Sequence, residues 1–519
     1  MNEAVSRRPV LSALLAAGLL LTAVAWLRGA EYDEQYTLFL TGRVARPVWP
    51  AGIITAGEVQ ELQAAHVGFT AIARDLRATD VHPPLYFWTV AAWRRLGGDS
   101  LFAARLASVL FSVVTLSLVA AIARSAGIPA VPAVLLTVGC YGFAYTGAIA
   151  RGFALAQMLS VVGIAVLSTA RHRAGPMLAA GTLLGAATFA NYLAAFVACA
   201  ALVHTVIARR RSRRSNPHPA GDCFVASLLA MTAGAVLVGF AVWLPADLWF
   251  FLAQRQSRVA QFEPFEPVSA LAQLARYSAA TVFGGLPLYV SGIARTTVTL
   301  TLALFLVGLI ALTVRRWRHI ATPATSKLLA MAAAAPPIGL LLLGLAFDNT
   351  PIELRYLAFA TPFIGLLLAA ALPRQIRYAV LVVQAIALLG LMTRSETMQP
   401  ARATAIAAAS LVGDGVVLLP HGNDGVGIVG AFAIEAPPTM RLLVISLDAT
   451  AALVRAQVSG YPRVVLALLG QDEASRATLP VMRQAFADPC WRAAGQAFNV
   501  QAFDRIDGEE WGCSSKASR

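Results

Sequence analysis

The chain has 519 residues, of which 58% are hydrophobic and only 13% are charged, and its mean hydropathy is +0.67. Soluble globular proteins carry about 45–50% apolar and about 25% charged residues, so this composition excludes a protein that water surrounds on every side. The net charge of +14 comes almost entirely from arginines in short runs between apolar segments. Such runs are typical of membrane topology, and we expect no nucleic-acid partner.

Apolar segments long enough to cross about 30 Å of hydrocarbon as helices recur along the chain. They predict an α-helical polytopic membrane domain over residues 1–393, with roughly eleven transmembrane helices and an uncleaved first helix. The expected spans are 10–28, 101–123, 128–149, 153–170, 176–190, 192–208, 223–245, 292–314, 327–347, 354–372 and 376–393. The stretch 176–208 is continuously apolar, and Asn191–Tyr192 is the expected turning point within it.

The basic runs give this arrangement a direction, because loops on the cytoplasmic side of a membrane are enriched in Lys and Arg. With the N-terminus inside, each strong run falls on the inner side. The runs are Arg124–Ser125, Arg171–Arg173, Arg209–Arg214, Arg315–His319 and Arg374–Arg377. The loops 29–100 and 246–291 and the tail 394–519 are then expected outside. Both loops contain amphipathic stretches, for which packing onto the bundle and gating of a substrate are the two alternatives.

The tail 394–519 changes texture. Apolar runs typical of strands at 416–420, 440–447 and 462–470 alternate with helix-like stretches at 400–412 and 478–488, which predicts a small α/β domain with a partly parallel sheet. The segment GNDGVGIVG (422–430) is rich in glycine, but it lacks the GxGxxG spacing and does not lead clearly into a helix, so we expect no nucleotide site there. In an oxidising compartment Cys490 and Cys513 are permitted to form a disulfide.

Two external motifs carry ionisable residues at the mouth of the bundle, where such residues are functional candidates. Asp33 and Glu34 stand in EYDEQYT, just beyond the first span; the alternative is that they are merely solvated. In DVHPPLYFW, two prolines stiffen the chain and fix the direction of His82, which is placed to donate to an anion. The alternative is an ordinary interfacial loop.

Two arginines are expected on the outer side, against the usual preference of Arg for the inner side. Arg151 stands in ARGFALAQ at the start of the fourth span, and Arg355 stands in ELRYLAFATPF at the start of the tenth. An anion is expected to hold each of them, either a neighbouring acid such as Glu353 or a substrate phosphate.

The order of these four motifs resembles the GT-C membrane glycosyltransferases over roughly residues 10–395. It is most similar to the protein mannosyltransferase-like group (glycosyltransferase family 39) and its aminoarabinose-transferase relatives. The resemblance implies a GT-C bundle, a sugar donor on a polyprenyl phosphate of the undecaprenyl type, and an acidic residue of the first external loop that activates the acceptor. It also implies that basic residues hold the donor phosphate.

Carried onto this chain, the resemblance assigns a role to each candidate. Asp33 becomes the catalytic base or the carboxylate that orients the acceptor, with Glu34 as its partner or substitute. Tyr86 and Tyr356 become substrate-cavity candidates. The donor phosphate is assigned to His82, Arg151 and Arg355, although His82 stands where aminoarabinose-type relatives have Lys.

The function expected from the motifs and the resemblance is an inverting transferase of a hexosyl or pentosyl group to a lipid, glycan or protein acceptor. Its expected location is the bacterial inner membrane, in contact with membrane lipids, with the C-terminal domain in the periplasm. The alternatives are a lipid or sugar flippase and a polymerase or ligase of surface glycans. No cofactor is demanded, and the residues neither require nor exclude a divalent metal.

Overall fold

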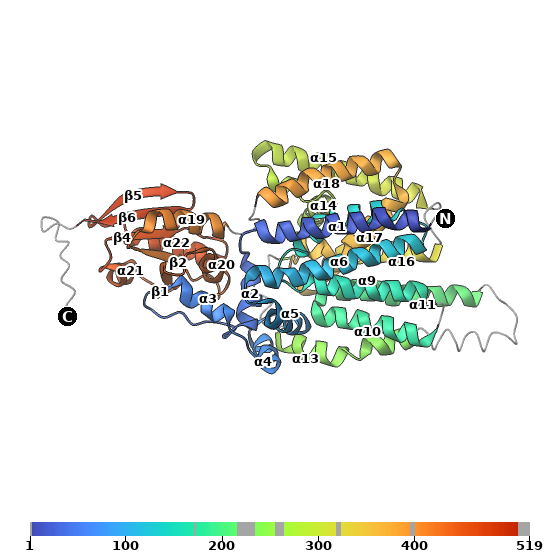
Figure 1. Ribbon diagram of the computed structural model, residues 1–519, viewed down its shortest axis with the longest axis horizontal. Coiled ribbons are helices and arrows are strands. Elements are labelled where there is room, and N and C mark those ends of the chain that lie inside the picture. Colours follow the sequence, from blue (N-terminus) through green and yellow to red (C-terminus); the bar gives the residue numbers. More distant parts are fainter. Residues whose placement is uncertain are drawn as a thin grey trace. The chain divides into compact units, whose positions relative to one another are not determined.

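The computed structural model describes residues 3–170, 173–214, 234–254, 264–317, 323–394 and 400–506 (Figure 1). The chain forms two compact units. The first, which we call the helical unit, comprises Met1–Leu27, Leu76–Val90 and Ala104–Arg394. The second, the C-terminal unit, comprises Arg28–Asp75, Ala91–Ala103 and Ser395–Arg519. The loop 29–100, which the sequence analysis placed in the membrane domain, is therefore divided between the two units.

The helical unit consists of apolar helices that run side by side (Figure 1). The α-helices wholly within it are α1 (Glu3–Leu27), α7 (Ala130–Val138), α8 (Tyr141–Thr146), α9 (Phe153–Thr169), α10 (Ala174–Ala190), α11 (Ala195–Arg214), α13 (Leu244–Gln254), α14 (Pro267–Val282), α15 (Gly292–Arg315), α16 (Pro323–Phe347), α17 (Thr361–Ala371) and α18 (Arg374–Thr393). Helices α5 (Leu85–Gly97) and α6 (Leu101–Ser125) enter it with part of their length. Short 3-10 helices are η1 (Tyr192–Ala194), η3 (Leu286–Tyr289) and η5 (Leu354–Ala360). Helix α9 packs along α10, α7 along α17, and α11 along α16.

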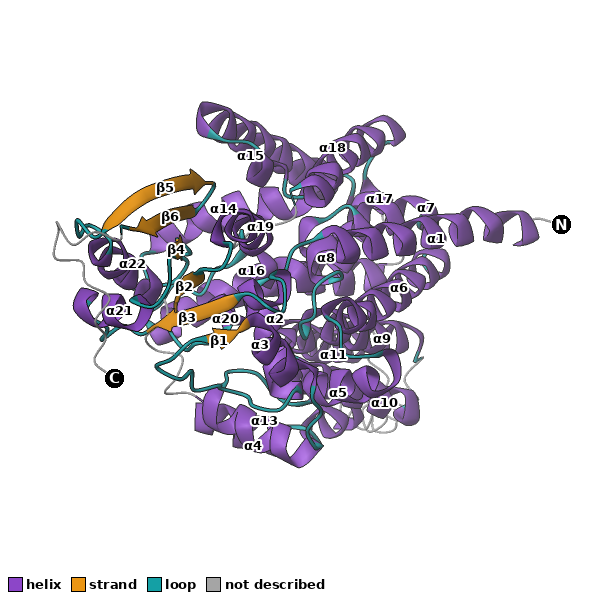
Figure 2. Ribbon diagram, turned by 60° about the vertical axis from the view of Figure 1, so that its left-hand side comes forward, coloured by secondary structure: helices purple, strands orange, loops and turns teal. Residues whose placement is uncertain are grey.

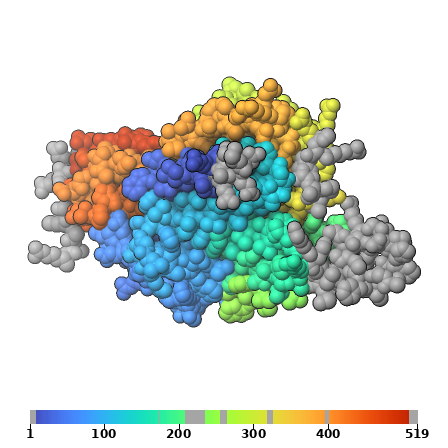
Figure 3. Space-filling view, turned by 45° about the vertical axis from the view of Figure 1, so that its right-hand side comes forward, coloured from blue at the N-terminus to red at the C-terminus, as the bar shows by residue number. Residues whose placement is uncertain are grey.

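The outer surface of this unit is apolar, as a lipid-facing surface must be. In the space-filling view α1 lies at the surface between α6 and α18 (Figure 3). Leu11, Leu15 and Leu19, spaced four residues apart on α1, are 63%, 66% and 63% exposed. A stripe of largely exposed leucines at helical spacing is stable when hydrocarbon covers it. The chain is a multi-pass membrane protein.

Among the described residues, six helical segments are long and apolar enough to cross a membrane. They are Arg8–Leu27, Leu101–Ser125, Gly292–Arg315, Thr325–Phe347, Leu354–Ala371 and Arg374–Thr393. The pair Gly234–Ala241 and Leu244–Gln254, bent by 47°, makes a seventh if it counts as one span. The expected spans at 128–149, 153–170, 176–190 and 192–208 form shorter or interrupted apolar helices, so the count of eleven stays a prediction.

Some of the predicted segments fall partly outside the described ranges. They are residues 223–233 of the span 223–245, and Arg171–His172 and Arg318–His319 of the basic runs. The predicted turning point at Asn191–Tyr192 is described, and the helix does break there. Helix α10 ends at Ala190, and the side chain of Asn191 accepts a hydrogen bond from the Leu193 amide at 3.1 Å, which begins η1.

The C-terminal unit has a six-stranded sheet in the order β1-β3-β2-β4-β6-β5 (Figure 2). Its strands are β1 (Ile54–Thr55), β2 (Val416–Pro420), β3 (Arg441–Ile445), β4 (Arg463–Ala467), β5 (Trp491–Ala497) and β6 (Val500–Arg505). β2 pairs in parallel with β3 and β4, and the other pairs are antiparallel, so the predicted partly parallel sheet is confirmed. Cys490 is disulfide-bonded, and Cys513 lies outside the described residues.

Helices cover both faces of this sheet. Alternate residues of a strand point to opposite sides, and every residue of β2 is buried, so both faces of the sheet are apolar at this strand. Val417 and Leu419 pack with α19 (Ala401–Val412), α20 (Gly427–Glu435) and α3 (Ala56–Ala64). Val416 and Leu418 pack with α21 (Ala451–Val458) and α22 (Glu473–Ala485). An α/β domain with two apolar layers results.

Part of the first external loop is built into this unit. β1 pairs with β3 through Ile54 and Leu442, and α3 and α2 (Tyr32–Thr41) pack against α20. Helix α4 (Phe69–Thr79), also in this loop, follows α3. The expectation that GNDGVGIVG does not lead into a helix is wrong, because α20 starts at Gly427. Glycine costs about 1 kcal/mol per residue in a helix, and the burial of residues 427–433 offsets this cost.

Candidate active site

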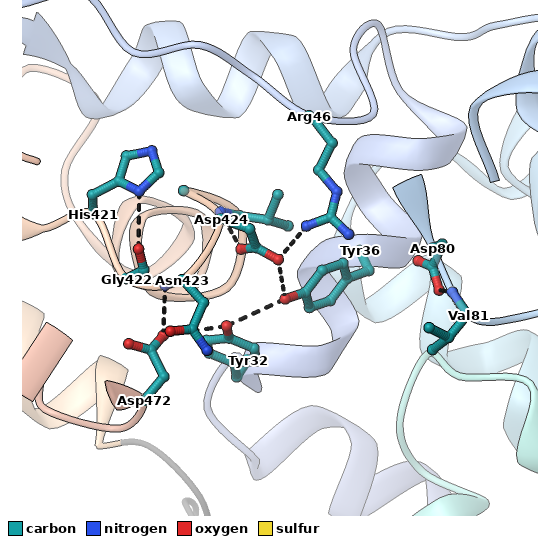
Figure 4. Close-up of polar contacts among 12 residues, drawn as sticks. Tyr32, Tyr36, Arg46, Asp80, Val81, His421, Gly422, Asn423, Asp424 and Asp472 are labelled. Carbon is teal, nitrogen blue, oxygen red and sulfur yellow. Dashed lines mark hydrogen bonds and ion pairs between the residues drawn. The ribbon is translucent and has the colours of Figure 1, made fainter. Parts of the chain in front are cut away.

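The loop before α5 presents a buried carboxylate to His82. Asp80, which is 6% exposed, accepts a hydrogen bond from the Val81 amide at 2.5 Å (Figure 4). It accepts a second hydrogen bond from His82 Nδ1 at 2.7 Å. Burial alone would raise the pKa of Asp80, but the contacts with His82, followed by the charge of Arg151, hold this pKa well below its usual range. Asp80 is therefore a fixed negative charge at neutral pH.

The second ring nitrogen of His82 meets an arginine. His82 Nε2 lies 3.3 Å from Arg151 Nη2. A guanidinium has only donors, so Nε2 must be the acceptor, and the ring proton then stands on Nδ1 and is donated to Asp80. The backbone is held as well, because Gln254 Nε2 of α13 donates to the carbonyl oxygens of His82 at 3.1 Å and of Leu76 at 3.0 Å.

Arg151 lies in the bend between α8 and α9 and is only 6% exposed. The next residue, Gly152, gives room for close packing. A Cβ at this position would lie 2.8 Å from the Ala190 carbonyl oxygen and 3.3 Å from the side chain of Tyr86, which is fully buried. Tyr86 thus belongs to the buried core and packs directly beside the bend that contains Arg151.

Arg355 lies in η5, where its Nη2 forms an ion pair with Glu353 Oε2 at 2.6 Å. Burial raises the pKa of Glu353 to about 7, against the opposing charge of Arg151 and a hydrogen bond from Tyr356. The Arg355 guanidinium stands 5.6 Å from the centre of the Tyr356 ring, and this ring stacks on Phe153 at 6.4 Å. The acidic partner expected for Arg355 is therefore present, in Glu353.

The structure thus brings the three predicted basic residues into one cluster of the helical unit. His82 contacts Arg151, and the charge of Arg151 acts on Glu353, the partner of Arg355. Sequence reasoning named no role for Asp80 and Gln254 and treated Glu353 only as a neighbour. The Asp-x-His spacing in DVHPP was a signal for Asp80, whereas nothing in the sequence linked Gln254 to residue 82.

The two acidic candidates stand in the first turn of α2, in the C-terminal unit, so the structure describes them separately from the basic cluster. Glu34 Oε2 accepts the Glu31 amide at 3.0 Å, as the return half of a capping box, and is fully buried. Its carboxylate therefore has a structural role in helix capping. Asp33 is 9% exposed and is the better candidate for a base.

Metal ligands do not converge in the described ranges, where His, Cys, Asp and Glu form no group of three or more that could hold an ion. The chemistry that the cluster offers is electrostatic. A cluster of two guanidiniums and a histidine can bind a phosphate group, since arginine pairs bidentately with phosphate oxygens and stays charged.

Comparisons with known proteins bear on the fold of the chain. Residues 81–240, which begin in the DVHPP loop and include Arg151, match the family of dolichyl-phosphate-mannose-protein mannosyltransferases. Among solved structures, ArnT from Cupriavidus metallidurans bound to undecaprenyl phosphate matches with a TM-score of 0.50 at 11% identity, over 96% of this chain and 98% of ArnT. The chain has the GT-C fold.

Two further solved structures are similar to this GT-C chain at lower scores. ArnT from the same organism in the apo state matches at 14% identity with a TM-score of 0.40, over 96% of this chain and 98% of that one. The S. cerevisiae protein O-mannosyltransferase Pmt1-Pmt2 complex matches at 13% identity with a TM-score of 0.33, over 48% and 35%. No curated protein sequence matches the chain. The family match and the GT-C fold confirm the resemblance inferred from the motifs.

Proposed function

We propose that this chain is an inverting glycosyltransferase that moves a sugar from a polyprenyl phosphate of the undecaprenyl type to an acceptor on the outer face of the bacterial inner membrane. One observation carries the proposal: a GT-C chain holds the buried Arg151 against His82 and the partly buried Arg355 against Glu353, in one cluster. The similar ArnT structure contains undecaprenyl phosphate, which supports a lipid of this class as the donor carrier.

The reaction needs a base for the acceptor hydroxyl and countercharge for the departing phosphate. Asp33 takes the proton of the acceptor hydroxyl while its oxygen attacks the anomeric carbon of the sugar. The bond between this carbon and the phosphate oxygen breaks, and the electron pair leaves with the polyprenyl phosphate. Arg151 and Arg355 stabilise the added negative charge, and His82 holds Arg151 in place at this phosphate site by accepting a hydrogen bond from it. One carboxylate and one displacement give inversion at the anomeric carbon.

The acceptor is a lipid, a glycan or a protein, and the sugar is a hexose or a pentose. The donor enters from the membrane, which explains why a transferase is built from apolar helices. In this proposal Tyr356, which stacks on Phe153, lines the substrate cavity, and the fully buried Tyr86 supports the cavity wall from its place beside Gly152. The C-terminal unit works in the periplasm.

A transporter is a second candidate, and one observation favours it. Asp247 is 8% exposed within the bent pair of helices that includes α13, and transporters place ionisable residues in broken membrane helices. Asp247 Oδ2 accepts a hydrogen bond from Thr188 Oγ1 of α10 at 2.6 Å, an interaction that also fits simple helix packing. The two functions differ in the product, since only the transferase forms a new glycosidic bond.

The test begins with mass spectrometry of envelope glycolipids and glycoproteins from a deletion strain, which identifies the acceptor. The purified full-length chain is then assayed in vesicles that contain the polyprenyl-phosphate sugar. Asp33→Asn should lower the rate about 10²- to 10⁴-fold, as expected for loss of a general base. Arg355→Ala should weaken donor binding in a folded protein. Substantial transfer by Asp33→Asn would remove Asp33 as the base, and movement of lipid without any glycosylated product would favour the transporter.

A further inference from the structure

Helix α2, which carries Asp33, uses one face to pack on the part of the C-terminal unit that follows residue 400. Tyr32, Gln35, Tyr36 and Phe39 follow each other at spacings of three, one and three residues, so they share this face. Helix α20 approaches it at two glycines. A Cβ at Gly427 would lie 2.3 Å from the Tyr32 ring, and a Cβ at Gly430 would lie 2.8 Å from the Phe39 ring.

These contacts give a physical reason for the glycine-rich segment 422–430. Any side chain larger than hydrogen at Gly427 would collide with a rigid ring rather than with the end of a flexible side chain. Gly427 and Gly430 are three residues apart and lie on the same side of α20, so together they form the surface that α2 touches. The glycines thus serve close packing of α2 on α20.

Hydrogen bonds and an ion pair reinforce this packing (Figure 4). The Tyr36 hydroxyl donates to Asp424 Oδ2 at 2.5 Å, and Arg46 forms an ion pair with the same oxygen. The Tyr32 hydroxyl donates to Asp472 Oδ2 at 3.3 Å. Burial, followed by the charge of Asp424, raises the pKa of both tyrosines above the ordinary value, so both hydroxyls remain donors at neutral pH.

Asp424 and Asp472 are themselves fixed by the backbone. Asp424 Oδ1 accepts the Val426 amide at 3.0 Å, and Asp472 Oδ2 accepts the Asn423 amide at 3.1 Å. Asp472 also caps α22, since its Oδ1 accepts the Ser475 amide at 2.7 Å. The two carboxylates therefore connect α2 to rigid parts of the sheet domain.

The position of this contact in the sheet is informative. Asp424 follows the carboxyl end of β2, and Asp472 follows that of β4. In the sheet, β2 stands between β3 and β4. The chain runs from β2 to β3 on one side, and from β3 it crosses over β2 to reach β4 on the other side. Such a switch point is where open α/β sheets bind their ligands. Here the tyrosines of α2 contact the residues that follow these strand ends.

A second connection fixes the start of α2. The Ala30 amide donates to Glu435 Oε1 at 2.7 Å. Arg402 of α19 holds Glu435 at 2.8 Å and donates to the Arg28 carbonyl oxygen at 3.0 Å. Asp33 thus stands between two fixed points, residues 28–30 and Tyr36. The residues that hold these two points all come from the C-terminal part of the chain, after residue 400.

We propose that the C-terminal unit positions Asp33 for catalysis, with Asp424 as the principal positioning residue. This inference rests on the proposed function, in which Asp33 is the base. Asp424 touches neither the sugar nor the acceptor; it acts through Tyr36 and Arg46 by keeping α2 in one place. The polar contacts of Asp424 therefore set the rate of sugar transfer and leave the affinity for the donor lipid unchanged.

The experiment compares Asp424→Asn with Asp448→Asn in the full-length chain. Asn removes the ion pair with Arg46 but keeps the shape of the side chain. Asp448 is the matched control, because it is a fully exposed carboxylate that follows β3 in the same unit. We expect Asp424→Asn to lower kcat about 10- to 100-fold, the effect of a displacement of about 1 Å. The donor Kd should stay within twofold of wild type, and the control should behave as wild type.

A double variant separates positioning from general stability. In the Asp33→Asn background the base is gone, so adding Asp424→Asn should cause no further loss of kcat; a full further loss would overturn the inference. Tyr36→Phe keeps the ring packed and removes only the hydroxyl, and it replaces Asp424→Asn if that variant does not fold. If Asp33→Asn transfers sugar at the wild-type rate, Asp33 is not the base, and the proposal that Asp424 positions it is refuted as well. If Asp33→Asn is inactive while folded Asp424→Asn and Tyr36→Phe keep wild-type kcat, only the positioning role is refuted.

Discussion

Replacing Asp80 by Asn tests whether this carboxylate sets the state of His82. In the wild type, Asp80 accepts the Nδ1 proton at 2.7 Å, and Nε2 faces Arg151 at 3.3 Å. An amide in place of the carboxylate removes the charge and is able to turn its NH₂ group toward Nδ1. The ring proton would then move to Nε2, where it opposes the guanidinium of Arg151.

The size of the effect follows from the contact that is lost. Asp80 is almost fully buried, so water does not replace the missing charge. A hydrogen bond to a charged group contributes about 1.5–3 kcal/mol. Since about 1.4 kcal/mol corresponds to a tenfold change, we expect kcat/KM for the donor to fall about 10- to 100-fold.

The assay is steady-state sugar transfer by the purified chain in vesicles, with the donor Kd measured separately by calorimetry. Asp75→Asn is the matched control, because Asp75 pairs with the exposed Arg74, and surface pairs of this kind contribute about 1 kcal/mol or less. His82→Gln should lower kcat/KM as much as Asp80→Asn does, and the double variant should lose little more. A folded Asp80→Asn variant with kcat/KM and Kd within twofold of wild type would refute the reasoning.

Two further predictions concern the second acid and the topology. As the pH falls through about 7, Glu353 becomes neutral and Arg355 loses its anionic partner. The charge of a phosphodiester donor stays constant over this range. We therefore expect the affinity for the donor to rise from pH 8 to pH 6. Because the native pKa is raised, the corresponding stability is present at low pH and is lost as the pH rises through about 7. In Glu353→Gln, calorimetry should show no such pH dependence of donor affinity, and thermal unfolding should show no such pH dependence of stability. The same pH dependence in the wild type and in Glu353→Gln would contradict this role of Glu353. Reporter fusions at Arg214 and Gly470 should report opposite sides of the membrane, and signals from the same side would break the predicted order of spans.

The features that the sequence predicted well depend on neighbouring residues. Long apolar runs, the helix break at Asn191 and the three strands around 416–420, 440–447 and 462–470 follow from local patterning. The parallel pairing of these strands could also be expected, because helices alternate with them. The spans between residues 128 and 208 were predicted less well, since a break of a few residues shortens an apolar helix without changing its composition.

Features that depend on contacts between residues far apart in the chain could not be predicted from the sequence. No local pattern shows that Ile54 pairs with Leu442, or that α2 packs against Gly427 and Gly430. The glycine-rich segment has low intrinsic helix propensity, and α20 forms there only because tertiary packing buries it. In the candidate site, the basic residues could be named from motif order, but the contacts of Asp80 and Gln254 required the fold.

The two acids of the basic cluster are suited to different tasks. With Asp80 and Glu353 ionised, their charges balance those of Arg151 and Arg355, so an incoming phosphate meets a site without net charge. The pKa of Asp80 is held well below its usual range, so this acid keeps its charge and continues to orient His82. The pKa of Glu353 lies at about 7, so this acid takes up a proton at little cost when negative charge arrives. Sugar transfer converts a phosphodiester with one negative charge into a phosphate monoester with up to two. We therefore expect Glu353 to be more protonated with the lipid product bound than with the donor bound, and its deprotonation to favour product release.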